Sequence, residues 1–246
     1  MHPEKTERFR AAHREEIGPR YDGRVHFAVL NLVLPSVIVG SLASVAAPSL
    51  RELAIVPVAF VIANLAEYLG HRYPMHRAMW PLERLCHRHA GMHHRFFTHR
   101  AMRADSHRDW AAVLFPPVLL LFFLGAIATP IGVALFVFSS SNTGFLFVAT
   151  AAAYFLLYEW LHLAYHQPDD SFVGRRAIVR VLRRHHMTHH DPARMTRVNF
   201  NITFPICDFV FGTNASTHSV VDEGQAEPAG PMGEPVSETG DTVATP

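Results

Sequence analysis

The stretch Arg183-Arg184-His185-His186-Met187-Thr188-His189-His190-Asp191 decides the fold, because it packs four histidines into six positions. The chain has 18 histidines, and 14 of them fall in three windows, 71–107, 162–166 and 185–190. Imidazoles that recur at short helical spacings are typical of a metal site. The fold must therefore bring the three windows together.

The composition indicates a membrane protein. Of the 246 residues, 49% are hydrophobic and 17% are charged, whereas a soluble domain has about 25% charged residues. The formal net charge of +1 is unevenly distributed, because Arg197 is the last lysine or arginine and six acids lie in the tail 214–246. The rest of the chain is therefore basic, which suits anionic lipid headgroups. The two cysteines, Cys86 and Cys207, form no Cys-x-x-Cys pair, so a metal site must use nitrogen or oxygen ligands.

Four apolar stretches are predicted to cross the membrane as helices, since about 20 apolar residues span a hydrocarbon core about 30 Å thick. The predicted spans are approximately residues 26–47, 53–70, 110–129 and 143–162. Pro116-Pro117 is expected to kink the third span without preventing it from crossing. The outer turn before the fourth span lies either at Thr129-Pro130 or in the Ser/Asn stretch 139–144, and hydropathy leaves both positions open.

The predicted fold class is all-α, a polytopic bundle of about four transmembrane helices capped by a cytoplasmic helical domain that carries the histidines. Basic loops face the cytoplasm, and the metal-binding segments 71–109 and 162–212 are rich in arginine. Both termini and the metal site are therefore expected on the cytoplasmic side. Residues 1–24, which lack a cleavable signal pattern, form either a membrane-surface lead-in or a plain solvated helix. The membrane-embedded domain is 25–213, and 214–246 is expected to be a disordered acidic tail.

Two histidine windows have spacings at which imidazoles share metal ions. His162 and His166 are four residues apart and project from one helical face. The i, i+3 and i, i+4 spacings of His186, His189 and His190 gather three rings on one side. His189 and His190 are adjacent, so their side chains diverge by about 100° and can serve two metals.

The other histidine windows depart from this pattern. His71 and His76 are five residues apart and point about 140° apart on a straight helix, so Pro74 is expected to break the helix and re-aim one ring. The block 89–94 repeats the histidine spacing of the block 186–190 with one extra residue. This leaves open whether His89 or a neighbour is its first ligand. His87 and His185 are the alternates to His89 and His186, while His99 and His107 lie outside the repeating pattern.

Ten histidines form the predicted ligand set, about the number that a pair of first-row metals needs. They are His71, His76, His89, His93, His94, His162, His166, His186, His189 and His190. Nearby polar groups that can fix the imidazole tautomers are Glu67, Glu159, Asp191 and Asn199. Asp191 is the first choice because it directly follows His190.

These boxes resemble those of the integral-membrane fatty acid hydroxylase and sterol desaturase superfamily. Its members carry His-x4-His, His-x2-His-His, His-x3-His and His-x2-His-His boxes on cytoplasmic extensions of a four-helix membrane bundle. The resemblance covers about residues 55–213 and includes the closing segments 199–203 and 208–213, which look like the family's end segment with its final Phe-Gly-Thr. The second box departs from the family pattern by its one inserted residue.

The resemblance implies a membrane enzyme, a non-haem di-iron hydroxylase that activates dioxygen to oxidise a lipid C–H bond. Its substrate would be a fatty acyl chain, sterol, carotenoid or aminolipid, and hydroxylation is favoured over desaturation. The cofactors are two iron ions, which zinc can replace during purification, together with dioxygen. Because the chain has no haem, flavin or cysteine-ligated iron–sulfur motif, electrons are expected from an external partner of ferredoxin or cytochrome type. No nucleic acid partner is expected, and the sequence predicts no oligomeric state.

Two other classes of function fit the sequence less well. A metal transporter should place ionisable ligands at mid-membrane, but the predicted span interiors contain almost none. A non-catalytic metal-binding relative would keep the bundle and lose one or more boxes, yet all four are present in this chain. We therefore favour the enzyme over both.

Overall fold

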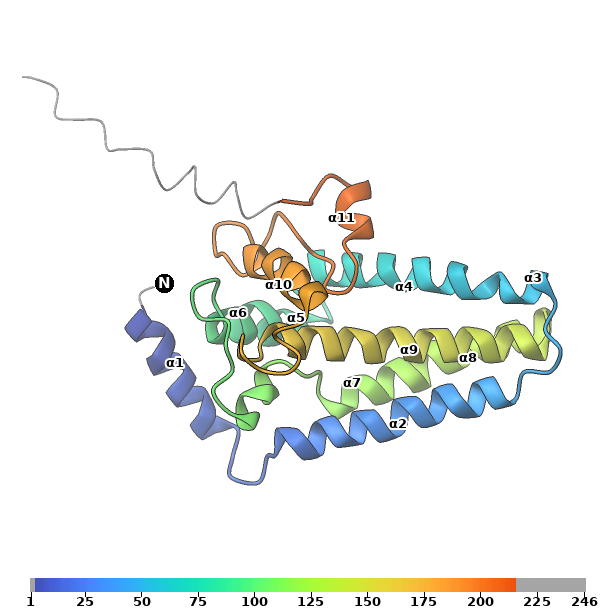
Figure 1. The fold of residues 1–246 in the computed structure, drawn as a ribbon, viewed down its shortest axis with the longest axis horizontal. Coiled ribbons are helices and arrows are strands. Elements are labelled where there is room, and N and C mark those ends of the chain that lie inside the picture. Colours follow the sequence, from blue (N-terminus) through green and yellow to red (C-terminus); the bar gives the residue numbers. More distant parts are fainter. Residues whose placement is uncertain (1–2, 216–246) are drawn as a thin grey trace, which may run out of the picture.

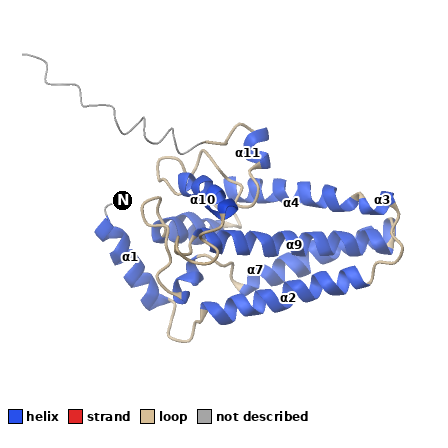
Figure 2. Cartoon of the chain, in the orientation of Figure 1, coloured by secondary structure: helices blue, strands red, loops and turns tan. Residues whose placement is uncertain are grey.

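The computed structural model of the protein describes residues 3–215, and every regular element in that range is a helix (Figure 2). Most of the predicted acidic tail lies outside the described residues. In chain order the elements, with 3-10 and π helices labelled η, are α1 (Pro3–Glu16), α2 (Gly23–Ala43), α3 (Leu50–Leu53), α4 (Ile55–Arg72), α5 (Glu83–Cys86), η1 (His87–His93), α6 (His94–Phe96), η2 (His107–Ala112), α7 (Pro117–Phe122), η3 (Phe123–Ala128), α8 (Thr129–Phe138), α9 (Ser141–Tyr165), α10 (Ala177–His189) and α11 (Ile206–Val210).

Four helical segments are long and apolar enough to cross a membrane, which confirms the predicted all-α bundle. They are Gly23–Ala43, Leu50–Arg72, His107–Phe138 and Ser141–Tyr165. Their outer faces are apolar, as contact with lipid requires: Leu32 is 69% exposed, Val61 54% and Leu121 70%. The segments run side by side, with α3 at one end of the bundle and α10 at the other (Figure 1).

The third segment is a chain of short helices rather than one kinked helix. Helix η2 ends at Ala112, and α7 begins at Pro117. Pro116 takes an extended conformation (ψ 148°), as expected for a residue that precedes a proline. The segment then continues to Phe138, so the turn before α9 lies at Ser139 and Ser140, in the second of the two stretches that the sequence left open. The Ser140 hydroxyl caps α9 by accepting the backbone N–H of Thr143 at 3.2 Å.

Helix α9 is the central helix of the bundle, since α2, α4 and α8 each pack against it (Figure 1). Small residues allow the close approach of α8. A Cβ atom on Gly144 would lie 2.6 Å from the Gly132 carbonyl oxygen, which is too close to fit. Small residues serve this purpose in membrane helices because van der Waals packing, not the hydrophobic effect, holds such helices together.

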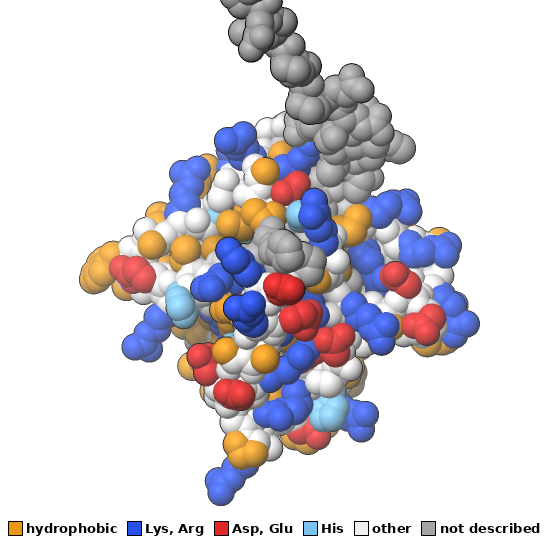
Figure 3. All heavy atoms as spheres, turned by 90° about the vertical axis from the view of Figure 1, so that its left-hand side faces the viewer, with side chains coloured by type: hydrophobic (Ala, Val, Ile, Leu, Met, Phe, Trp, Pro, Cys, Tyr) orange, Lys and Arg blue, Asp and Glu red, His pale blue; other side chains and the backbone are white. Residues whose placement is uncertain are grey.

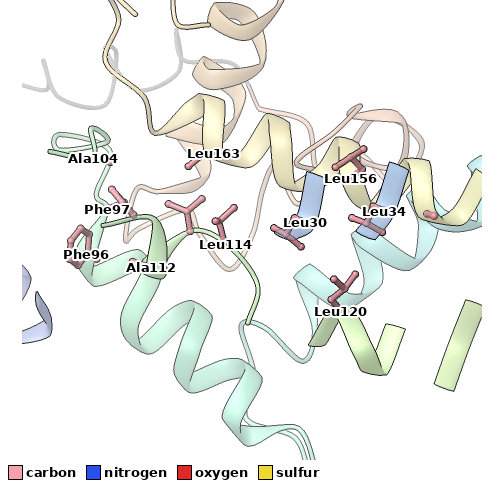
Figure 4. Packing of buried hydrophobic residues seen from close by; sticks show 12 residues of the cluster. Leu30, Leu34, Phe96, Phe97, Ala104, Ala112, Leu114, Leu120, Leu156 and Leu163 are labelled. Atoms are coloured by element: carbon pink, nitrogen blue, oxygen red, sulfur yellow. The ribbon is translucent and has the colours of Figure 1, made fainter. Parts of the chain in front are cut away.

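The main core lies where α2 meets α9 and extends toward the end of the bundle that carries the histidines, here called the histidine end. Figure 4 shows Leu30 and Leu34 of α2 facing Leu156 of α9. Phe96 and Phe97, which are fully buried, belong to the same cluster. The histidine end is therefore packed continuously with the membrane bundle.

Helix α1 is docked on the histidine end rather than free in solvent. Arg14 makes a paired contact with Asp109, from Nε to Oδ1 at 2.7 Å and from Nη2 to Oδ2 at 2.8 Å. Arg10 is buried and donates to the carbonyl oxygens of Phe96 and Ala101, both at 2.8 Å. The expectation of a plain solvated helix is therefore wrong for residues 3–16. Figure 3 views the molecule from this end and shows arginine and lysine side chains spread over the face, with a few acidic ones between them.

Candidate metal centre

The structure brings all ten predicted histidines together at one end of the bundle. Each of them is at most 8% exposed. The end of α4 and the turn after it carry the first box, and η1 with the start of α6 carries the second. The ends of α9 and α10 carry the third and fourth boxes. Segments that are far apart in the sequence thus meet in one buried cluster.

The imidazoles form two groups, in each of which the ligand atoms lie within 4.8 Å of one another. The first group is His71, His76, His89, His94 and His189, and the second group is His93, His166, His186 and His190. His162 lies at the edge of the second group, with its Nε2 atom 3.2 Å from Nε2 of His93. Two groups agree with the expectation of a pair of metals.

Neighbouring histidines are divided between the groups. His93 belongs to the second group and His94 to the first, and His190 and His189 are divided in the same way. This is the divergence of about 100° that adjacent helical residues must show. The expectation that all three rings of the fourth box lie on one side is therefore wrong, because the His189 ring turns to the first group.

The inserted residue of the second box is accommodated by a π-helix, η1 (His87–His93). A π-helix bonds residue i to i+5, so residues five apart share a face. His89 and His94 are five apart, and their Nε2 atoms lie 3.1 Å from each other. His87 is exposed, so His89 is the residue that this box brings into the first group. The other alternate, His185, instead contacts Asp208, with 3.2 Å between Nε2 and Oδ2.

The first box adopts the geometry that its proline predicts. Helix α4 ends at Arg72, two residues before Pro74. The chain then turns, so that the rings of His71 and His76 stack with their centroids 5.1 Å apart. On an uninterrupted helix the two rings would point apart.

Backbone carbonyls set the tautomers of five histidines. The acceptors of the Nδ1 hydrogens are Phe200 for His71, Ala112 for His93 (2.7 Å), Met102 for His166 (2.8 Å), Val198 for His189 (2.9 Å) and Phe97 for His190 (2.7 Å). A carbonyl oxygen can only accept a hydrogen bond, so Nδ1 of each ring must carry the proton. Nε2 is then unprotonated, and its lone pair is free to bind a metal.

The distances between Nε2 atoms fit metal ions. They are 2.8 Å for His71 and His89, 3.0 Å for His76 and His189, 2.9 Å for His186 and His190, 3.2 Å for His93 and His190, and 3.4 Å for His166 and His186. Two ligands about 2.1 Å from one ion lie about 3.0 Å apart at a right angle and about 3.4 Å apart at the tetrahedral angle. In the pair His93 and His190 the backbone carbonyls leave both Nε2 atoms unprotonated, so these atoms would repel each other at 3.2 Å, and a cation between them removes the repulsion.

The protonation state of the rings also suits metal binding. Burial is the main cause that lowers the pKa of His93 to about 3 and that of His76 to about 2. Burial likewise lowers the pKa of His89, His94 and His190 well below the ordinary value. The rings are therefore neutral near pH 7, as imidazole ligands must be.

Comparison with known proteins decides the family. The family model for fatty acid hydroxylases matches residues 56–213, which is more than half of the chain and contains all ten histidines. The chain belongs to the fatty acid hydroxylase family. A search of curated proteins and a search of solved structures found no match. Membership confirms the resemblance to the fatty acid hydroxylase and sterol desaturase superfamily, and with four candidate spans it indicates a multi-pass membrane protein.

None of the four polar side chains expected to orient imidazoles makes a hydrogen bond to the ten histidines of the described chain. Asp191 follows the end of α10 and accepts the Ala193 backbone N–H at 3.0 Å, so it closes a turn instead. Glu159 accepts the backbone N–H of Phe115 at 3.2 Å. Asn199 has a positive φ of 58° and donates to the His185 carbonyl oxygen at 2.9 Å.

Glu67 acts on the histidines indirectly, through the backbone. Its carboxylate accepts the N–H of Thr203 at 3.0 Å and that of Ile202. These residues follow Val198 and Phe200, whose carbonyls hold His189 and His71. Glu67 therefore ties the closing segment of the chain to α4.

Asp208 holds the same closing segment from the other side, and sequence reasoning missed it. The carboxylate is fully buried and accepts the backbone N–H groups of Phe200 and Asn201, each at 2.8 Å, and the hydroxyl of Thr213 at 2.7 Å. Burial alone would raise the pKa of Asp208, but hydrogen bonds from His185 and from the backbone outweigh it and lower the pKa. The signal in the sequence was a lone acid in an otherwise apolar stretch, Ile206–Val210.

An apolar cavity of about 350 Å³ reaches the histidine cluster from within the bundle. It lies between α4 on one side and α7, η3 and α8 on the other, and α9 forms its floor. His71 lines its end nearest the histidines, while Ala59, Ile131 and Phe147 line the end nearest α3. An apolar ligand in the cavity would therefore lie against the first group.

Proposed function

We propose that this protein is a membrane-bound, dioxygen-dependent lipid hydroxylase. It inserts one oxygen atom into a C–H bond of a fatty acyl chain, sterol, carotenoid or aminolipid. The observation that carries the proposal is the junction of the apolar cavity with the histidine cluster at His71. An apolar substrate in that cavity presents its C–H bonds to the ligands of the first group.

The two histidine groups would hold one iron ion each, and zinc can occupy the same nitrogen sites. When bound, the ions supply the redox chemistry with dioxygen that side chains lack. The protein itself performs three tasks. The carbonyls of Phe97, Val198 and Phe200 fix the orientation and tautomer of the imidazoles that they hold. The burial of the rings keeps them neutral. The apolar cavity excludes water from the reacting carbon.

The reaction needs electrons from outside the chain. One oxygen atom enters the lipid, and the other leaves as water after taking up two electrons and two protons. A redox protein of ferredoxin or cytochrome type is the proposed donor. Support comes from the exposed arginines over the histidine end, such as Arg95, Arg100 and Arg184, because a basic face favours an acidic partner. The same basic residues favour a cytoplasmic position for this end.

The experiment that tests the function compares the lipids of cells that express the wild-type protein with those of cells that express His166→Ala. Mass spectrometry should find lipids that have gained one oxygen atom in the wild-type cells alone. Lipids that have lost two hydrogen atoms would identify a desaturase of the same family. Identical lipids in the two cell lines, with both proteins present in the membrane, would contradict an enzymatic role.

A further inference from the structure

One face of α4 is lined with small residues where it meets the cavity. Ala59, Ala63, Ala66 and Gly70 are spaced by four, three and four residues, which places them on one side of a helix. The opposite wall is made of larger side chains, namely Phe115, Leu119, Phe122 and Phe123. The cavity is therefore a slot along α4 that exists because these four positions carry little or no side chain.

The slot is closed at the end away from the histidines. Ile131 and Phe147 line that end. Beside this end α8 and α9 are in contact, since a Cβ atom on Gly132 would lie 2.4 Å from Cγ2 of Val148. The lining of the slot ends at Ile131, Phe147 and Ala59, so a chain in the slot ends there as well.

The slot is open at its side toward the region that lipid occupies. Among its lining residues Ile62 and Phe122 are each 56% exposed and Ile131 is 44% exposed. Helix α4 and helix α8 both pack against α9, and within the described residues they pack little against each other. A lipid chain can therefore move into the slot from the bilayer.

A buried polar atom without a partner lies at the histidine end of the slot. Tyr158 lines the slot, is 7% exposed, and its hydroxyl has no hydrogen-bond partner within the described chain. Its ring stacks on Phe115 with centroids 5.1 Å apart, and it lies one helical turn from His162. A buried hydroxyl without a partner favours a ligand that brings an acceptor.

We propose that the slot measures the length of one unbranched alkyl chain. The chain lies along α4 with its terminal methyl group at the closed end beside Ala59, and with its oxygen-bearing end near Tyr158 and the histidines. This inference rests on the proposed function and adds the substrate class and the residues that select it. A chain longer than the slot cannot place its methyl group beside Ala59 and its oxygen-bearing end near Tyr158 at the same time.

The dimensions of the slot give the expected length. Twelve residues separate Ala59 from His71 on α4, which corresponds to about 18 Å of helix rise. Successive carbons of an extended alkyl chain advance by about 1.25 Å, as tetrahedral bond geometry requires. The slot therefore accepts about fourteen carbons. Its volume of about 350 Å³ is that of roughly a dozen water-sized groups, which suits one chain and not two.

The test fills the slot one step at a time with Ala59→Leu, Ala63→Leu and Ala66→Leu. Cells that express each variant are fed saturated fatty acids of graded length, and mass spectrometry reads the chain lengths of the oxidised lipids. The preferred chain should shorten by about five carbons from the first variant to the second and by about four from the second to the third. Val61→Leu adds the same group on the lipid-facing side of α4, where Val61 is 54% exposed, and should keep the wild-type profile.

Two further variants keep the proposal testable if a filled slot prevents folding. Phe147→Ala lengthens the closed end and should shift the preference toward longer chains. Tyr158→Phe should raise KM about fivefold, the effect of one lost neutral hydrogen bond, and leave the length profile unchanged. Metal content of the purified variants serves as the folding control and should match that of the wild type.

Failure of this inference differs from failure of the proposed function. The slot does not measure chains if the wild type oxidises lipids but the metal-loaded variants keep its chain-length profile. The same conclusion follows if the variants lose activity equally toward all chain lengths. Oxidation of a sterol with no oxidised acyl lipid would overturn the inference in the same way. If the wild type oxidises no lipid, the proposed function itself fails.

Discussion

His189 and His190 are adjacent in the chain, yet their imidazoles belong to different groups. Nε2 of His189 lies 3.0 Å from Nε2 of His76, whereas Nε2 of His190 lies 3.2 Å from Nε2 of His93. Each residue also has its own backbone acceptor, Val198 for His189 and Phe97 for His190. One turn at the end of α10 therefore contributes a ligand to each of the two proposed metal ions.

The division between these neighbours predicts distinct single-site losses. His189→Ala should lower the metal content from about two ions per chain toward one by weakening the first group, and His190→Ala should do the same to the second group. In the proposed function both ions take part in the reaction, so both variants should lose activity. Metal analysis of the purified proteins measures the loss, and His87→Ala, a change at an exposed histidine outside both groups, is the matched control. Full metal content in both ligand variants would refute the division.

Arg10 is predicted to support the second group from a distance. It holds the carbonyls of Phe96 and Ala101, beside Phe97 and Met102, whose carbonyls orient His190 and His166. Arg10→Met should cost about 2–3 kcal/mol of stability, since charged hydrogen bonds are lost in a buried place. Thermal unfolding in detergent measures this cost.

The same variant should also weaken metal binding about 10- to 100-fold, as loss of a supporting contact commonly does. Arg8→Met is the control on the same helix, because the Arg8 side chain is 82% exposed. Equal stability and equal metal affinity in the two variants would show that α1 does not support the centre.

The sequence predicted the bundle and the ligands better than the contacts around them. Apolar runs of sufficient length indicated four spans, and the spacing of the histidines indicated two metals. The sequence did not reveal the π-helix that accommodates the extra residue before His93, because one inserted residue can equally form a loop. It also did not reveal the carbonyls that orient the rings, since every residue has a carbonyl. Asp191 was misleading because proximity in sequence to His190 does not give proximity to its ring.

Asp208 is predicted to be the acid-sensitive anchor of the closing segment. Its pKa is lowered in the folded protein, so its contribution to the free energy of unfolding is full above the unfolded value of about 3.9 and is lost as the pH falls through the folded value. Asp208→Asn removes the charge and should cost about 1–3 kcal/mol at neutral pH.

The His71 ring should also become less ordered in Asp208→Asn, because Asp208 holds the Phe200 backbone and the Phe200 carbonyl orients that ring. Thermal unfolding together with metal analysis measures both effects. Asp170→Asn, a change at an exposed carboxylate, controls for the loss of one negative charge. Unchanged stability in Asp208→Asn would contradict the anchoring role.

Removal of metal is predicted to make the protein sensitive to mild acid. Burial lowers the pKa of His93 to about 3 and that of His76 to about 2. The pKa of histidine in an unfolded chain is about 6.5. The unfolded chain then binds protons that the folded one cannot. The free energy of unfolding should therefore be full above about pH 6.5 and fall as the pH drops toward about 3.

Unfolding midpoints of chelated and metal-loaded protein, measured across this range, test that prediction. The metal-loaded protein should unfold at higher temperature at each pH, because the ions bind the folded state. A midpoint of the chelated protein that does not change with pH would show that the imidazoles are not held neutral by burial.

The central claim is that the two histidine groups direct oxygen from dioxygen into a lipid chain. The most direct test supplies iron-loaded protein in lipid nanodiscs with a chemical reductant and heavy-isotope dioxygen, and follows the lipids by mass spectrometry. We predict that the wild type gives lipids that carry one heavy oxygen atom and that His189→Ala gives none. Products that contain oxygen from water, or no oxidised lipid from the iron-loaded wild type, would contradict the account.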